Sequence, residues 1–354
     1  MTKVLESLNA ALHRCLATDD RVVILGEDIL DPYGGAFKVT KGLSTAFPDR
    51  VWTTPVSESA LVGAATGMAL RGLRPVVEIM FGDFTTLIAD QLINHAAKFA
   101  TMYGAAAAVP MVVRTPMGGR RGYGPTHSQT IEKLYCGIPG LRVLAASAFG
   151  DPGAHLATAV LEGTGPVLFV ENKVLYNTEI RPVSSPLFAS VERGSAASPA
   201  AAEDLTCRQS ESCGITSSPS YLVNVANGGT PSVTMVSYGY TAELAAQALV
   251  RLAYEFEVFA ELVVMGQLAP FDMGPIRQSL RATGRLLTIE EGTRTLGWGT
   301  EVVARAAEDS ALALRQVRRL ATDDIAIPAA GPLELAVLPS VDDIVKAAVE
   351  MASA

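Results

Sequence analysis

The sequence predicts an α/β protein with two domains, each built on a mostly parallel sheet that carries helices on both faces. Short apolar runs rich in β-branched residues alternate with stretches of helical periodicity. The chain has 354 residues, enough for about two domains of roughly 150 residues each. A stretch rich in Ser, Ala, Pro and Gly separates two such alternating series.

The first series opens with a predicted helix over residues 3–18, where apolar side chains recur at helical spacing. A second helix is expected from Ser57 or Ser59 to about Arg71, and a long helix over residues 86–103. Continuous apolar runs predict buried parallel strands. They cover residues 22–25, 75–80, 110–114, 141–144 and 167–170.

These patterns divide the chain into a first domain over residues 1–183, a linker over 184–230 and a second domain over 231–354. The linker has few large apolar residues and the composition of a flexible connection. In the second domain, strands are expected over residues 233–238, 262–265 and 286–289, and helices over 242–254, 275–283 and 299–308.

Composition excludes several classes of function. The chain has 28 Lys and Arg against 36 Asp and Glu, a formal charge of −8, which argues against nucleic acid as a partner. Mean hydropathy is +0.28 and apolar residues make up 49%, yet no run approaches the roughly 18–20 apolar residues of a membrane span. We therefore expect part of the apolar surface to lie against other subunits.

The four cysteines, Cys15, Cys136, Cys207 and Cys213, show no spacing typical of a metal site or a redox pair. The N-terminal residues form an amphipathic helix that carries an acid, which is not the pattern of a signal or transit peptide. The expected compartment is therefore a reducing one, the cytoplasm.

Glu58 stands immediately before a helix that contains Gly63 and Gly67. A carboxylate at a helix start is often only a favourable partner of the helix dipole. Each glycine, however, costs about 1 kcal/mol of helix propensity relative to alanine. That cost indicates that another helix or a cofactor approaches this face closely.

Phe84 and Glu27 each follow a predicted strand, at the edge of the sheet where open α/β folds bind ligands. For Phe84 the alternatives are a core aromatic and an aromatic plate beside a ligand. For Glu27 the plainer alternative is a surface acid.

His127 lies in a glycine-rich run, Arg121–Gln129, which predicts a long mobile loop between a strand and a helix. A histidine among glycines is not placed like a core residue, and such loops often carry catalytic groups. Its ordinary pKa suits proton transfer near neutral pH. His13, His95 and His155 fall in predicted helices and are expected to be structural.

Several motifs follow one another at the spacing of a known family. They are GED at 26–28, YGGAFKVTKGL at 33–43, TPVSE at 54–58, GLRPVVE at 72–78, HSQ at 127–129 and PGL at 139–141. Over nearly its whole length the chain resembles the beta subunit of two-component, thiamine-diphosphate-dependent 2-oxo acid dehydrogenases of the pyruvate, branched-chain and acetoin types. The resemblance implies a pyrimidine-binding transketolase-like domain, followed by a C-terminal transketolase-like domain.

The resemblance also assigns roles to the candidate residues. Glu58 matches the glutamate that hydrogen-bonds N1′ of the cofactor's aminopyrimidine and favours the imino tautomer, which removes the thiazolium C2 proton. Phe84 matches the aromatic residue that stacks on the pyrimidine, often a tyrosine in relatives. His127 matches a loop histidine near the reacting carbon, and Glu27 a glutamate in the tunnel that joins two active sites.

One family feature is missing from this chain. Thiamine-diphosphate enzymes hold Mg²⁺ and the diphosphate with a Gly-Asp-Gly motif and a downstream Asn pair, whereas the Gly-Asp pairs here, at Gly82 and Gly150, are followed by Phe and Pro. The resemblance therefore implies an alpha subunit that holds Mg²⁺ and the diphosphate, within an α2β2 heterotetramer. No residue pattern here indicates a metal site, including one for a monovalent cation.

The expected function is decarboxylation of a 2-oxo acid with acyl transfer to the lipoyl group of an acyltransferase. The run at Gln267 lacks the Asp-Leu-Arg common in relatives, and the linker is unusually long. These departures keep open a carboligase or transketolase-like transfer without a lipoyl partner. A third alternative, a non-catalytic scaffold subunit, is disfavoured by Glu58 and His127.

Overall fold

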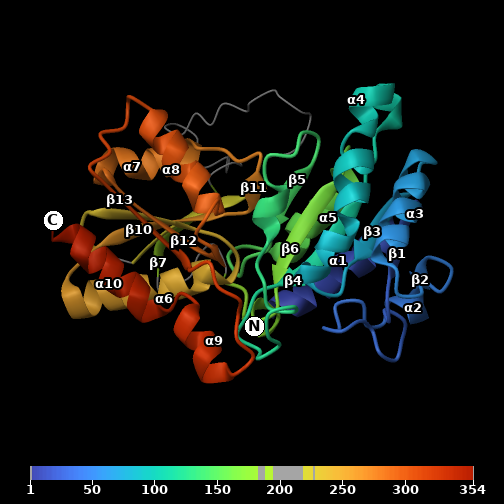
Figure 1. The fold of residues 1–354 in the computed structure, drawn as a ribbon, viewed down its shortest axis with the longest axis horizontal. Coiled ribbons are helices and arrows are strands. Elements are labelled where there is room, and N and C mark those ends of the chain that lie inside the picture. The colour runs from blue at the N-terminus through green and yellow to red at the C-terminus, as the bar shows by residue number, and fades with distance from the viewer. Residues whose placement is uncertain (1, 182–187, 194–217, 226–227, 354) are drawn as a thin grey trace.

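The computed structural model describes residues 2–181, 188–193, 218–225 and 228–353, and these residues form two sheets that lie side by side (Figure 1). The first sheet has seven strands in the order β11-β5-β6-β4-β3-β1-β2. Its first six strands in the chain are β1 (Val22–Gly26), β2 (Val51–Thr53), β3 (Arg74–Glu78), β4 (Val112–Met117), β5 (Arg142–Ala145) and β6 (Val167–Asn172). Neighbours among them pair in parallel, as predicted.

Alternating side chains of this sheet enter two different cores. Val22 and Ile24 pack with helices α1 (Val4–Thr18) and α5 (Pro152–Glu162). Val23 and Leu25 pack on the other face with α3 (Glu58–Leu70). Burial on both faces explains why these strands are continuous apolar runs rather than alternating ones.

The second sheet has six strands in the order β13-β12-β9-β10-β8-β7. Helices α6 (Gly239–Phe256) and α10 (Val341–Ala352) pack on one face, and α7 (Gly274–Thr283) and α8 (Trp298–Glu308) on the other. A short helix, α9 (Gly331–Val337), precedes α10. The strands are β7 (Phe188–Arg193), β8 (Ser220–Val225), β9 (Val233–Ser237), β10 (Ala260–Met265), β12 (Arg285–Thr293) and β13 (Gln316–Thr322).

The two halves share structure. After β10 of the second sheet, the chain crosses to the first sheet. There it forms strand β11 (Gln267–Ala269), which pairs antiparallel with β5 at the edge. One apolar cluster runs from Val23 and Val113 of the first sheet to Val236 and Trp298 of the second half. The contact between the halves is therefore part of the hydrophobic core.

Strands β7 and β8 lie inside the segment predicted as a linker. They pair antiparallel with each other, and β8 pairs antiparallel with β10. Part of this segment therefore belongs to the second sheet. Residues 184–187, 194–217 and 226–227 of this segment, which include Cys207 and Cys213, lie outside the described residues. The predicted domain boundaries therefore stay a prediction.

The single long helix predicted over residues 86–103 is wrong. The chain instead forms a 3₁₀ helix, η1 (Gly82–Ile88), a π-helical turn, η2 (Gln91–Ala96), and a short helix, α4 (Phe99–Tyr103). In η1 the hydroxyls of Thr85 and Thr86 donate to carbonyls three residues earlier, at Gly82 and Asp83. Such side-chain bonds compete with regular α-helical pairing. Among the described residues, no helix is long and apolar enough to cross a membrane.

Candidate active site

Glu27 and Glu58 are neighbours at the carboxyl edge of the first sheet. The backbone N–H of Thr54 donates to the carbonyl of Gly26, so the chain that leaves β2 passes beside the end of β1. The backbone N–H of Ser57 then donates to the Glu27 carboxylate at 3.1 Å. Both glutamates are buried. Burial, with the Glu58 charge close by, raises the pKa of Glu27.

Glu58 is the first residue of α3, at the positive end of the helix dipole. Its side chain is only 7% exposed, yet its carboxylate accepts no hydrogen bond from the described part of the chain. Its unpaired oxygens are not among the fully buried polar atoms of the described residues, so they remain accessible at the start of α3. The position therefore suits a ligand that brings its own donor or proton.

Phe84 and His127 are in direct contact. Their ring centroids are 5.2 Å apart with an interplanar angle of 77°, and Phe81 contacts both rings at 5.7 and 4.8 Å. Phe84 lies in η1, and His127 lies in the loop after β4. Both side chains are half-buried, so this aromatic group is partly accessible.

The two pairs lie on the same side of the first sheet. Helix α3 packs against η1, and Phe84 packs on the same apolar cluster as Leu61 and Val62 of α3. Within the described residues, no hydrogen bond or ring contact joins Glu27 or Glu58 directly to Phe84 or His127. The structure thus brings the four predicted residues together as two pairs beside one helix.

Lys173 is a member of this site that sequence reasoning missed. It follows β6, is fully buried, and its Nζ donates to the backbone carbonyl of His127. Burial lowers its pKa to about 8. A lysine directly after a buried strand was the available signal, because ligand groups gather at this edge of the sheet.

Asp83 holds the other side of the histidine loop. Its carboxylate accepts the side-chain amide of Gln129 at 2.8 Å, and its second oxygen is buried without a partner in the described part of the chain. The loop predicted to be mobile is therefore bonded at His127 and at Gln129. The segment after it is a 3₁₀ turn, η4 (Glu132–Tyr135), rather than the predicted helix.

The glycine face of α3 is open in this chain. A Cβ added at Gly63 would be 3.5 Å from the side chain of Gln91, and one at Gly67 would meet nothing within 4 Å. The close approach predicted from the glycines is therefore not made at Gly67 by the described residues.

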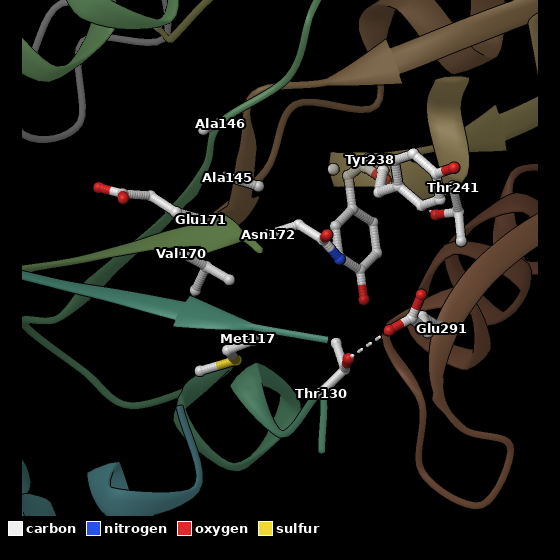
Figure 2. Close-up of a pocket in the computed structure, with 12 residues that line it drawn as sticks. Met117, Thr130, Ala145, Ala146, Val170, Glu171, Asn172, Tyr238, Thr241 and Glu291 are labelled. Atoms are coloured by element: carbon white, nitrogen blue, oxygen red, sulfur yellow. Dashed lines mark hydrogen bonds between the residues drawn. The ribbon is translucent and has the colours of Figure 1, made fainter. Parts of the chain in front are cut away.

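A small pocket lies nearby, between the two halves (Figure 2). Tyr238, Thr130 and Glu291 line one side of it, and Glu171 points away from them, toward its buried ion pair with Arg114. The four predicted site residues do not line this pocket. It belongs to the contact between the two halves.

The comparisons with known proteins cover nearly the whole chain. Residues 2–179 match the transketolase pyrimidine-binding domain and residues 223–344 the transketolase C-terminal domain. A pyruvate dehydrogenase E1 component subunit beta-2 from Oryza sativa subsp. japonica is 35% identical over 98% of this chain and 85% of that protein. The beta subunit of acetoin:2,6-dichlorophenolindophenol oxidoreductase from Cupriavidus necator is 33% identical over 97% and 95%.

The chain belongs to the family of 2-oxo acid dehydrogenase E1 beta subunits. The resemblance seen in the sequence is thus confirmed, as is the transketolase-like fold. A solved split-gene transketolase, described as an inactive beta4 tetramer, covers 99% of this chain with a TM-score of 0.71 at 21% identity. At that identity it supports the fold of this E1 beta subunit alone.

Proposed function

We propose that this E1 beta subunit supplies the aminopyrimidine-binding half of a thiamine-diphosphate-dependent enzyme that decarboxylates a 2-oxo acid. The observation that carries the proposal is Glu58, a buried carboxylate at the start of α3 without a donor from the described chain. The pyruvate dehydrogenase and acetoin oxidoreductase relatives support the reaction class. The acyl product passes to a lipoyl group.

The residues present fit the pyrimidine half of the cofactor. Glu58 would share a proton with a ring nitrogen, because its accessible carboxylate has no donor in the described chain. The half-buried Phe84 would give a flat ring a stacking surface. When bound, thiamine diphosphate supplies the carbon nucleophile that attacks the 2-oxo acid.

His127, Glu27 and Lys173 have supporting roles in this proposal. The imidazole of His127 holds or delivers a proton beside the reacting carbon. Lys173 fixes the backbone at His127 by donating to its carbonyl. Glu27 lies against Glu58 with a raised pKa, so it holds a proton more readily than an exposed glutamate and can pass it along the site.

An alpha subunit completes the site in this proposal, as two alpha and two beta chains. It holds Mg²⁺ and the diphosphate, because this sequence lacks the Gly-Asp-Gly motif and the Asn pair for that task. The open Gly67 face of α3 is where it would pack. The cytoplasm is the proposed compartment, and the free thiols of Cys15 and Cys136 fit any reducing compartment.

A carboligase reaction without a lipoyl partner is the second candidate. It is favoured by Gln267, which stands in the run that departs from the family's Asp-Leu-Arg. In the structure Gln267 is in β11, where its side-chain oxygen accepts from Arg142 and Ser218 at 3.0 Å. A changed edge at β11 would alter a surface on which a lipoyl acyltransferase could dock.

The test is turnover by the alpha–beta complex. The two chains are co-purified and supplied with Mg²⁺ and thiamine diphosphate, and a panel of 2-oxo acids is assayed with ferricyanide and then with aldehyde acceptors. We expect Glu58→Gln and Glu58→Ala to lower kcat at least ~100-fold with the complex intact, because proton sharing is lost.

Glu301→Gln is the matched control. Glu301 lies in the first turn of α8, so it interacts with a helix dipole but lies outside the site. Its replacement should leave kcat within about twofold. If Glu58→Gln behaved like Glu301→Gln, Glu58 would be only a dipole partner. If the wild-type complex showed no turnover in either assay, the proposal that it is an enzyme would be wrong.

A further inference from the structure

The loop that carries His127 is bound by the second half of the chain. Glu334 in α9 accepts the backbone N–H of Arg120 at 2.8 Å through one carboxylate oxygen and that of Gly122 at 2.9 Å through the other. Glu291 in β12 accepts the N–H of Gly119 at 2.7 Å. Three N–H groups of one short loop thus end on two carboxylates from a distant part of the sequence.

Glu334 is suited to this task. Its side chain is 1% exposed, so its charge must be compensated by donors. Arg120 and Gly122 have φ values of +69° and +71°, a left-handed conformation that turns nearby N–H groups toward one anion. Because a non-glycine residue adopts this conformation at a cost, the hydrogen bonds to Glu334 stabilise the backbone at Arg120.

Packing supports the same contact. A Cβ at Gly122 would be 3.2 Å from the carbonyl oxygen of Ala329, and one at Gly124 would be 3.2 Å from the Ala329 side chain. The guanidinium of Arg120 also donates to the Pro339 carbonyl at 2.6 Å. The glycines of this loop therefore allow close packing against the segment around α9.

His127 lies a few residues further along this loop. Its ring contacts Phe81 and Phe84, and its carbonyl accepts from Lys173. These contacts fix the histidine from the side of the first sheet. The hydrogen bonds to Glu334 fix the part of the loop before His127, at Arg120 and Gly122. A shift of this part would move the imidazole relative to Phe84.

We propose that Glu334 is a positioning residue for His127: its carboxylate clamps the loop at Arg120 and Gly122 and so sets the place of the imidazole in the active site. This role rests on the proposed function of His127. It gives the second half of the chain a part in the reaction through a residue that touches neither substrate nor cofactor.

The experiment uses the alpha–beta complex with Glu334→Gln, which keeps the size of the side chain and removes its charge. Glu334→Asp, which keeps the charge and shortens the side chain, serves if the first variant does not fold. Hydrogen exchange of the peptide over residues 118–130 is measured together with kcat, KM and thiamine diphosphate binding. We expect at least tenfold faster exchange in this peptide and a kcat about tenfold lower, because a small displacement of a catalytic group is costly. KM and cofactor affinity should stay within about twofold.

Glu243→Gln is the matched control. Glu243 is also a buried carboxylate of the second half, in α6, and it pairs with Arg181 from the first half without touching the loop. It should lower stability without changing loop exchange or kcat. Unchanged loop exchange in Glu334→Gln overturns the clamp, and faster exchange with unchanged kcat overturns the positioning role. An inactive wild-type complex would contradict the proposed function instead, while hydrogen exchange would still decide the clamp.

Discussion

Glu290 shows how strongly a single buried acid can be perturbed in this fold. Its carboxylate accepts the backbone N–H groups of Trp298 and Gly299 at 2.8 and 2.9 Å, at the start of α8. A Cβ at Gly297 or Gly299 would come within 2.9 Å of this carboxylate, so both positions need glycine. These hydrogen bonds lower the pKa of Glu290, but burial has the larger effect and raises it to about 7.

This raised pKa predicts a pH-dependent stability. The folded chain keeps a proton on Glu290 up to about pH 7, whereas the unfolded chain releases it near pH 4.5. The stabilisation is therefore complete below pH ~4.5 and is lost as the pH rises through about 7. Glu290→Gln should reduce the fall in the free energy of unfolding between pH 5 and 7.5, by up to about 3 kcal/mol. Urea unfolding at several pH values measures this.

Glu350→Gln provides the comparison. Glu350 pairs with Arg318 on the surface, and that bond lowers its pKa, so its contribution has the opposite sign and is small because the pair is exposed. An unchanged slope in Glu290→Gln would show that Glu290 ionises normally in the folded chain.

At the scale of elements, α3 has two faces with different tasks. Leu61 and Val62 are buried in the core, while Ala60, Ala64 and Gly67 are exposed on the side that carries the glycines. Small side chains let a partner's backbone come close. Within this chain that side has room, since a Cβ at Gly67 would meet nothing within 4 Å.

Ala64→Leu should therefore leave the isolated chain unchanged and weaken its assembly with the alpha subunit. Overpacking of a close interface costs about 1–3 kcal/mol, which corresponds to about tenfold or more in affinity. Ala307→Leu, at an exposed alanine of α8, is the matched control and should assemble normally. Thermal unfolding and titration with the alpha subunit separate the two effects. If both variants bound the alpha subunit with equal affinity, α3 would not be part of the interface.

Local patterns predicted α3 and the central parallel strands, because apolar runs and helical spacing are properties of neighbouring residues, whereas strands β7 and β8 were predicted as a linker. The segment over residues 82–103 could not be predicted in this way, since threonine hydroxyls bond to nearby carbonyls and shift the local pairing. The same division applies to the site. Glu58 and His127 follow local motifs, whereas Glu334 reaches its partners across 212 and 214 positions of sequence.

At the scale of the whole molecule, the two halves act as one body. A single apolar cluster crosses between them, β11 extends the first sheet, and Glu334 and Glu291 bind the loop of His127. The first sheet carries the candidate residues, and the second half holds one of their loops in place. What the chain does not offer is a motif for the diphosphate and its metal ion.

This asymmetry predicts how the cofactor binds. In the proposed site, Glu58 and Phe84 engage only the flat ring, and the diphosphate is held by Mg²⁺ and ligands of the alpha subunit, which offset its charge. The beta subunit alone should therefore bind thiamine diphosphate at least ~100-fold more weakly than the alpha–beta complex, by titration calorimetry with Mg²⁺ present. Chelation of Mg²⁺ should release the cofactor from the complex and leave the weak binding by the beta subunit unchanged. Binding by the beta subunit alone as tight as that of the complex would show that this chain holds the diphosphate itself, and the shared site would be wrong.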